Sequence, residues 1–118
     1  MARVVAQPKP DWEPVPRPGC HGVEVRVLLR DDELLIANLR FAREATIDAH
    51  AAPWEIEVLV LDGRGCASVG DEVVELVAGQ TLHWPADVEH RLWTEDSTLE
   101  TLMVERIGAA APAGGAGS

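Results

Sequence analysis

The sequence predicts an all-β protein built as a sandwich or a closed barrel. Apolar residues at positions 23, 25, 27 and 29 alternate with charged Glu24 and Arg26, which is the period-two pattern of a half-buried strand. Further strand-like segments follow at intervals of roughly 8 to 12 residues, a spacing typical of sandwiches and barrels. No segment carries capping signals at both ends of a three-turn helix.

Glycine, proline or an Asp-Ser pair separates most of the expected strands. These strands span residues 23–29, 34–41, 55–61, 64–69, 72–77, 82–84, 88–94 and 99–106. Asp62-Gly63 is a two-residue hairpin signal, so residues 64–69 are expected to pair back onto residues 55–61. Gly70-Asp71 marks the next turn.

Length and composition indicate one domain with its own core. A domain of 118 residues buries about two-thirds of its unfolded surface. The formal charge of -10 argues against a protein that tracks a phosphate backbone, because such proteins need a basic face. The sequence has no apolar run of roughly 20 residues and no signal peptide, so we expect a cytoplasmic protein that binds neither nucleic acid nor membrane. Cys20 and Cys66 form no CxxC motif and are expected to be reduced thiols.

The two ends of the chain differ from the strand-rich middle. Prolines between positions 8 and 18 deny residues 1–21 both helical hydrogen bonds and central strand pairing, so we expect an extended arm. Trp12 gives this arm a group to dock on its own barrel or on the partner subunit of a homodimer. Residues 108–118 are small and rich in glycine, which predicts a disordered tail.

Glycine, proline and histidine stand at set distances in two stretches of the middle segment. In GQTLHWPADVEH, Gly79 and Pro85 are separated by five residues, and Asp87 and His90 follow. This spacing resembles the second motif of the cupin family, with Asp87 replacing a usual glycine and Thr94 a usual asparagine. TIDAHAAPWEIEVLVLDG resembles the first cupin motif. Residues 22–107 are therefore similar to a small single-domain bacterial cupin, which implies a jelly-roll barrel, also called a double-stranded β-helix.

The resemblance also implies where a metal would be bound. Metal-binding cupins commonly use two histidines one residue apart, a third ligand on the next strand and the histidine of the second motif. His50 aligns with the first of these ligands and His90 with the last. Ala52 and Ile56 stand in the other two places, so two of the four expected ligands are absent.

Other side chains offer replacements for the missing ligands. Asp48 shares the strand parity of His50, so Asp48, His50 and His90 with water form one candidate site for iron, manganese or zinc. In another register, Asp48 and His50 replace the histidine pair and Glu55 is the third ligand. If Ile56 faces the interior, both Glu55 and Glu57 face outwards unless a bulge redirects one of them. A further interpretation of His50 is a surface or loop histidine left over from a metal-binding ancestor.

Three functions follow as hypotheses from this degenerate motif. The first is a small-molecule enzyme without a cofactor, an isomerase, cyclase, epimerase or lyase in natural-product tailoring, in which His50, His90 and Asp48 transfer protons. The second is an oxygenase or lyase that uses manganese, iron, copper or zinc at His50 and His90. The third is a barrel that binds a ligand without catalysis.

Substrate contacts are expected from strand residues that face the pocket. Ala52 and Ile56 would enlarge an apolar cavity, and Trp84 would line its mouth. Asn38 and Arg40 on the second strand are expected to point inwards, with Arg40 as the cation that holds an anionic substrate. His21 and His83 are expected to be structural or exposed.

Overall fold

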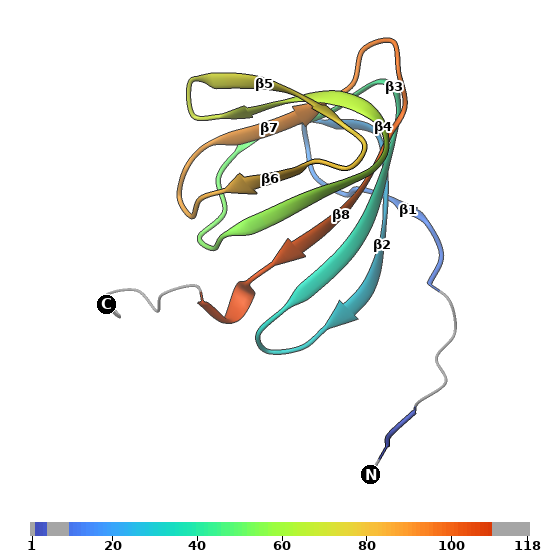
Figure 1. Cartoon of the computed structure of the whole chain (residues 1–118), viewed down its shortest axis with the longest axis vertical. Helices are drawn as coiled ribbons and strands as arrows, with labels where there is room; N and C mark the ends of the chain where they lie inside the picture. Colours follow the sequence, from blue (N-terminus) through green and yellow to red (C-terminus); the bar gives the residue numbers. More distant parts are fainter. Residues whose placement is uncertain (1, 5–9, 110–118) are drawn as a thin grey trace.

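The computed structural model describes residues 2–4 and 10–109, and strands dominate this part of the chain (Figure 1). This finding confirms the all-β prediction and the jelly-roll barrel. The described elements are β1 (Glu13–Pro14), β2 (Cys20–Arg30), β3 (Leu35–His50), β4 (Ile56–Val69), β5 (Glu72–Val77), β6 (Thr81–Trp84), β7 (His90–Trp93), β8 (Leu99–Glu105) and a 3-10 helix, η1 (Ile107–Ala109). Residues 110–118, most of the expected disordered tail, lie outside the described residues.

Two long strands, β3 and β4, belong to both walls of the barrel. The first half of β3 pairs with β2 and β8, and its second half pairs with β7. The first half of β4 pairs with β6 and β8, and its second half pairs with β5 and β7. One wall therefore runs β1-β2-β3-β8-β4-β6 and the other runs β3-β7-β4-β5, all antiparallel. The two walls close around a shared interior.

The prediction of a hairpin at Asp62-Gly63 is wrong, because β4 continues through these two residues. The register against β8 shifts between Val60 and Asp62, and Gly63 has a φ of 78°. A Cβ atom on Gly63 would lie 2.0 Å from the carbonyl oxygen of Thr98. Glycine is thus required here because the strand bends and its backbone closely approaches that of Thr98. Glycine can serve such a bend within a strand as well as a hairpin turn. Residues 64–69 pair with β5 and β7 instead of with residues 56–61.

A second bend lies inside β3, which extends nine residues beyond the predicted end at Phe41. Glu44 has a φ of 56°, an uncommon conformation for a residue other than glycine. The buried Thr94 hydroxyl donates a hydrogen bond to the carbonyl oxygen of Ala42 and accepts one from the Ala45 N–H, at 3.0 Å. Thr94 also donates its own N–H to the Ala45 carbonyl, at 2.9 Å. One side chain from the end of β7 therefore fixes the bend that carries β3 from one wall to the other.

The turn before β7 uses Asp87 where the cupin motif usually has glycine. Asp87 has a φ of 62°, and aspartate is among the residues that tolerate this region. Its N–H donates to the carbonyl oxygen of Ala52 at 2.8 Å. The loop before β7 is thereby tied to the loop between β3 and β4.

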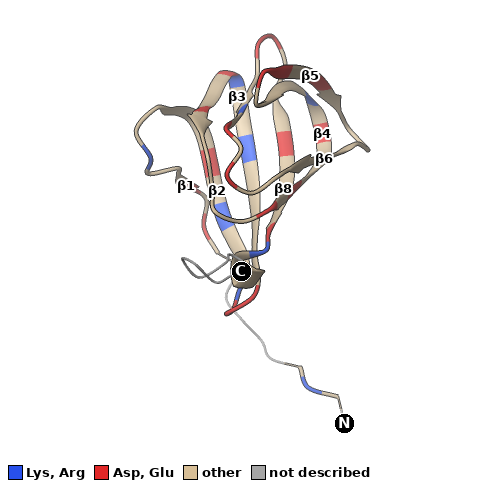
Figure 2. Ribbon diagram, turned by 90° about the vertical axis from the view of Figure 1, so that its left-hand side faces the viewer, with Lys and Arg blue, Asp and Glu red and all other residues tan. Residues whose placement is uncertain are grey.

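The core lies between the two walls and is mainly aliphatic. Its fully buried members include Phe41, Val58, Ala67, Leu92 and Leu99. Acidic positions are distributed over β2, β4, β5 and β8, as Figure 2 shows. In the described residues no helix is long and apolar enough to cross a membrane.

The described part of the N-terminal arm packs on its own barrel. β1 pairs with β2, with Glu13 opposite Val25 and Pro14 opposite Glu24. The guanidinium groups of Arg26 and Arg40 lie 4.4 and 4.2 Å from the ring centroid of Trp12. Such cation–π contacts contribute roughly 0.5–1 kcal/mol each at exposed sites. Trp12 thus anchors the arm on the outer face of β2 and β3.

We predict that Gly63→Ala destabilises the protein much more than Gly79→Ala. Both glycines have a positive φ, but a Cβ atom on Gly79 meets nothing within 4 Å. Gly79→Ala should therefore lower the free energy of unfolding only through the unfavourable positive φ, by about 1–2 kcal/mol. Gly63→Ala adds the clash with Thr98 and should cost about 4 kcal/mol or more. Urea denaturation measures both, and equal losses would contradict the close approach at Gly63.

Candidate functional site

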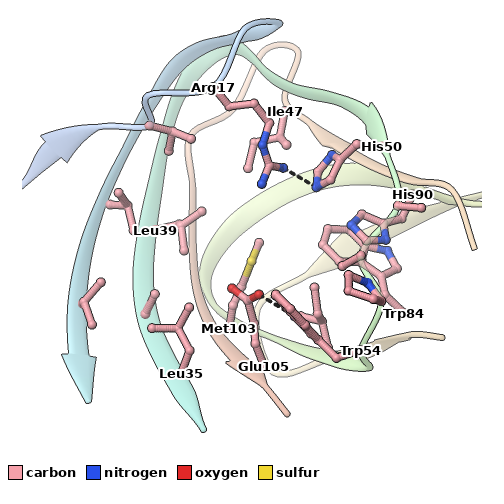
Figure 3. Close-up of a pocket in the computed structure, with 18 residues that line it drawn as sticks. Arg17, Leu35, Leu39, Ile47, His50, Trp54, Trp84, His90, Met103 and Glu105 are labelled. Atoms are coloured by element: carbon pink, nitrogen blue, oxygen red, sulfur yellow. Dashed lines mark hydrogen bonds between the residues drawn. The ribbon is translucent and has the colours of Figure 1, made fainter. Parts of the chain in front are cut away.

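A pocket of about 270 Å³ opens between the two walls of the barrel (Figure 3). Its lining is mostly apolar and comes from the arm, from β2, β3, β4, β6, β7 and β8, and from the loop between β3 and β4. The apolar part includes Leu35, Leu39, Ile47, Ile56 and Met103. The polar groups gather at two places, and each comes from a different part of the chain.

Two histidines meet on one side of the pocket. His50 is the last residue of β3 and His90 the first of β7, and antiparallel pairing makes them direct cross-strand partners. Their ring centroids are 4.6 Å apart, with the planes at 72°. The sequence motifs therefore converge on one pair of imidazoles.

His90 lies in a buried, nonpolar environment. Its side chain stacks on Trp84, with ring centroids 4.0 Å apart and planes at 4°. His90 is 1% exposed, and neither ring nitrogen has a hydrogen-bond partner among the described residues. Burial, and then the nearby His50, lower the pKa of His90 to about 4. The backbone of Val88 acts in the opposite direction, and Arg17 makes a smaller lowering contribution. His90 is therefore a neutral imidazole at pH 7.

His50 is oriented by a contact at each ring nitrogen. Its Nδ1 lies 2.8 Å from the carbonyl oxygen of Asp48, and its Nε2 contacts Nη1 of Arg17. A carbonyl oxygen only accepts and a guanidinium only donates hydrogen bonds. The tautomer that satisfies both contacts carries its proton on Nδ1 and has its lone pair on Nε2. Arg17, an exposed residue of the pocket lining, covers this lone pair (Figure 3).

Arg17 is the pocket cation, and its role was not predicted from the sequence. It stands in Arg17-Pro18-Gly19-Cys20, where the Cys20 N–H donates to the Arg17 carbonyl oxygen at 3.1 Å and Gly19 has a φ of 83°. Proline followed by a glycine of positive φ is the pattern of a type II turn. The Pro18-Gly19 pair therefore predicts a turn, but it does not indicate which part of the barrel the turn contacts.

A second polar pair lies across the pocket from Arg17. The indole N–H of Trp54 donates to Oε1 of Glu105 at 2.8 Å (Figure 3). Both residues line the pocket, and the position of Glu105 there was not predicted from the sequence. The pocket thus has a cation at one end and a carboxylate at the other.

The three apolar contacts predicted from the sequence all lie in the pocket wall. Trp84 and Ile56 are buried there, and Ala52 lies on the loop between β3 and β4. Ile56 stands opposite Trp84 in the pairing of β4 with β6. Side chains that replace metal ligands in the motif therefore widen an apolar surface beside the two histidines.

Asp48 is outside the pocket lining, which corrects the expectation that it shares the orientation of His50. The pairing of β3 with β7 shifts register between Ile47 and His50, so the alternation of sides is broken at Asp48. The exposed Asp48 side chain accepts a hydrogen bond from the Thr46 hydroxyl at 3.2 Å and approaches Arg91 at 4.0 Å. Asp48 contributes to the site only through its backbone carbonyl, which accepts the hydrogen bond from His50.

Asn38 and Arg40 also point away from the pocket, contrary to expectation. Their neighbours Ala37 and Leu39 line the pocket, so strand alternation directs Asn38 and Arg40 to the outer face. Arg40 pairs with Glu24 at 2.8 Å. Asn38 is buried and donates to the Thr101 carbonyl oxygen at 2.9 Å while accepting from Arg26. Arg40 contacts Trp12, and Asn38 binds Arg26, the other arginine that contacts Trp12.

Glu55 and Glu57 lie outside the pocket lining and hold His83. Nε2 of His83 lies 3.1 Å from Glu55, and its Nδ1 lies 3.0 Å from Glu57. Glu55 is therefore not available as a third ligand beside His50 and His90. His83 is exposed, as the sequence suggested.

The donors present at the pocket do not fit a transition-metal site of the usual cupin kind. Across residues 2–4 and 10–109, no three histidine, cysteine or acidic side chains converge on one point. The lone pair of His50 faces the guanidinium of Arg17, whose charge repels a cation. Two imidazoles without a carboxylate supply too few ligands for the sites that zinc or iron prefers.

Comparisons with known proteins agree with the fold. The cupin domain family matches residues 39–105. The polyketide cyclase RemF from Streptomyces resistomycificus is 22% identical, with 91% of this chain and 80% of that chain covered and a TM-score of 0.79. A cupin-2 domain, Rru_A2000 from Rhodospirillum rubrum, is 17% identical, with 90% and 75% covered and a TM-score of 0.77. KdgF from Halomonas sp. is 18% identical, with 81% and 87% covered and a TM-score of 0.68. No curated protein matches the sequence significantly.

We predict that His90 makes the protein sensitive to acid. A free histidine binds a proton near pH 6.5, whereas folded His90 does so only near pH 4, so the unfolded state binds more protons between these values. Stability must therefore fall as the pH falls from 6.5 to 4, by up to about 3 kcal/mol from this group. His90→Phe keeps an aromatic ring on Trp84 and should lose less stability over this range.

Urea denaturation at pH 7, 6, 5 and 4 measures the difference between wild type and His90→Phe. His21→Gln removes an exposed histidine and serves as the control. If wild type and His90→Phe lose equal stability on acidification, the conclusion that His90 is buried without hydrogen-bond partners is contradicted.

Proposed function

We propose that this chain, which belongs to the cupin family, is a small-molecule enzyme that uses His50 and His90 for acid–base chemistry, with intramolecular cyclisation as its reaction. The observation that carries the proposal is the pair of imidazoles, 4.6 Å apart, in a mostly apolar pocket. One of them is neutral at pH 7, and the other presents a fixed lone pair at Nε2. A neutral imidazole with a free lone pair can accept a proton and return it, which is the role we assign to His50.

The chemistry follows from the tautomer of His50. Nε2 would take a proton from the carbon between two carbonyl groups of a substrate, leaving an enolate and an imidazolium. The enolate carbon attacks a third, more distant carbonyl carbon of the same molecule, and a carbon–carbon bond forms as the π bond of that carbonyl opens. The resulting alkoxide takes the proton back from His50. Atoms and charges balance without an oxidant, a reductant or a cofactor.

His90 has a different task in this scheme. It has two unpartnered ring nitrogens and lies beside His50, so it can donate a hydrogen bond to a substrate oxygen and accept one from another group. The stacked Trp84 holds its plane, which reduces the reorganisation needed during reaction. The carbonyl of Asp48 orients His50 in a comparable way.

The size and lining of the pocket fit a small, largely apolar ligand. Its volume of about 270 Å³ lies just below the roughly 300–1,000 Å³ typical of small-molecule sites. Folding a flexible chain inside such a wall would bring its reacting carbons together. RemF is described as a polyketide cyclase, and that description supports cyclisation as the reaction to test first.

A second candidate function is a barrel that binds a ligand without turnover. The apolar lining contributed by Ala52 and Ile56 favours it, because hydrophobic walls bind ligands whether or not chemistry follows. The metal-dependent alternative has no comparable support, since the donor set at the pocket does not fit it.

The test of the enzyme is cyclisation of linear poly-β-keto thioesters, followed by absorbance and by mass spectrometry of the products. We expect turnover by the wild-type protein, and a loss of 10²- to 10⁴-fold in kcat for His50→Gln and His90→Gln. His83→Gln changes an exposed histidine outside the pocket and should retain full activity. Unchanged turnover in both pocket variants contradicts the proposal. Ligand-induced stabilisation of the wild-type protein without turnover would favour the binding barrel instead.

A further inference from the structure

The N-terminal arm places a cation at the mouth of a pocket in an acidic chain. Arg17 contacts His50, and in the part of the chain that the structure describes no carboxylate forms a salt bridge with it. The protein carries a formal charge of -10, so an unpaired guanidinium at this mouth is unusual. We infer that Arg17 is a binding site for an anionic oxygen, and that the pocket takes small acids or enolates with an apolar body. This inference deepens the proposed function, on which it rests for the identity of the pocket.

The backbone around Arg17 fixes where its side chain starts. The type II turn of residues 17–20 is tied to β3 by the Asp48 N–H, which donates to the Gly19 carbonyl oxygen at 3.2 Å. The Val15 N–H donates to the Val23 carbonyl oxygen at 3.1 Å. Arg17 therefore projects from a segment held on both sides, while its side chain remains exposed enough to move.

The partner that Arg17 has in this structure is weaker than an anion. His50 Nε2 is a neutral acceptor, whereas a carboxylate or enolate oxygen forms a charge-assisted hydrogen bond roughly twice as strong. A ligand with an anionic oxygen would therefore replace His50 as the hydrogen-bond partner of the Arg17 guanidinium. The same exchange uncovers the lone pair on His50 Nε2, so binding of the ligand and exposure of the base are one event.

The charges facing the pocket also set the orientation of the ligand. Glu105, bonded to Trp54, lies across the pocket from Arg17 and repels an anion there (Figure 3). The anionic oxygen thus belongs at the Arg17 end, beside His50 and His90. The apolar body would extend along Leu35, Leu39 and Met103.

Trp12 is a positioning residue for Arg17. It lies five residues earlier in the same arm and rests against the guanidinium groups of Arg26 and Arg40 on the outer face. These two arginines are held by Asn38 and Glu24. Loss of the Trp12 ring would release the start of the arm and lower the fraction of molecules in which Arg17 reaches the pocket.

Isothermal titration calorimetry with 2-naphthoate and its neutral analogue 2-naphthamide tests this site. We expect wild type to bind 2-naphthoate more tightly, and Arg17→Gln to weaken that binding by about 10- to 100-fold without changing the affinity for 2-naphthamide. Arg64→Gln removes an arginine that pairs with Asp96 away from the pocket, and should bind both compounds as wild type does. The enolate of 5,5-dimethyl-1,3-cyclohexanedione, tested in the same way, separates recognition of enolates from recognition of carboxylates.

Trp12→Ala should lower the affinity for 2-naphthoate several-fold and leave that for 2-naphthamide unchanged, and Trp12→Phe should restore it. A general disruption of the pocket would weaken the binding of both compounds equally. The inference is overturned if Arg17→Gln binds both anions as well as wild type, or if wild type does not prefer the anions. These ligands do not cyclise, so Arg17-dependent binding without turnover of the keto thioesters would remove only the proposed function.

Discussion

The site depends on one constraint, the bending of β3 and β4 so that each belongs to both walls of the barrel. β3 needs the hydrogen bonds of Thr94 at its bend, and β4 needs Gly63 where it passes the Thr98 carbonyl. Without the first bend, the end of β3 would not meet β7, and His50 would not face His90. The pocket is the space left between the walls that these two strands hold together.

The electrostatics of the pocket follow from that geometry. A histidine at the start of β7 is enclosed by Trp84 and kept neutral by burial, whereas the histidine at the end of β3 reaches the mouth. Two chemically identical side chains therefore have different surroundings. Acid–base catalysis commonly uses such differences, because they separate the roles of paired groups.

Much of the fold and half of the site could be predicted from the sequence. Alternation in residues 23–29, strand-like composition and turn residues located most strands. The spacing from Gly79 to His90 predicted the barrel and His90, and the first motif predicted His50. Asp62-Gly63 misled because glycine serves bends as well as hairpins, and local sequence does not distinguish the two uses. Asp48, Asn38 and Arg40 were misplaced because a single bulge or an uncertain parity reverses the side to which a strand residue points. Arg17 was missed because its role arises from contact between segments 33 residues apart.

The separation of Arg17 from the barrel strands has a consequence for how such proteins diversify. The two histidines and the apolar wall come from strands whose packing tolerates little change, whereas the cation comes from a short surface segment before β2. Substitutions in that segment can alter which charge stands at the mouth without creating a cavity in the core. Ligand preference and barrel stability can therefore evolve independently, and exchanging the arm alone is a direct route to redesigning the pocket.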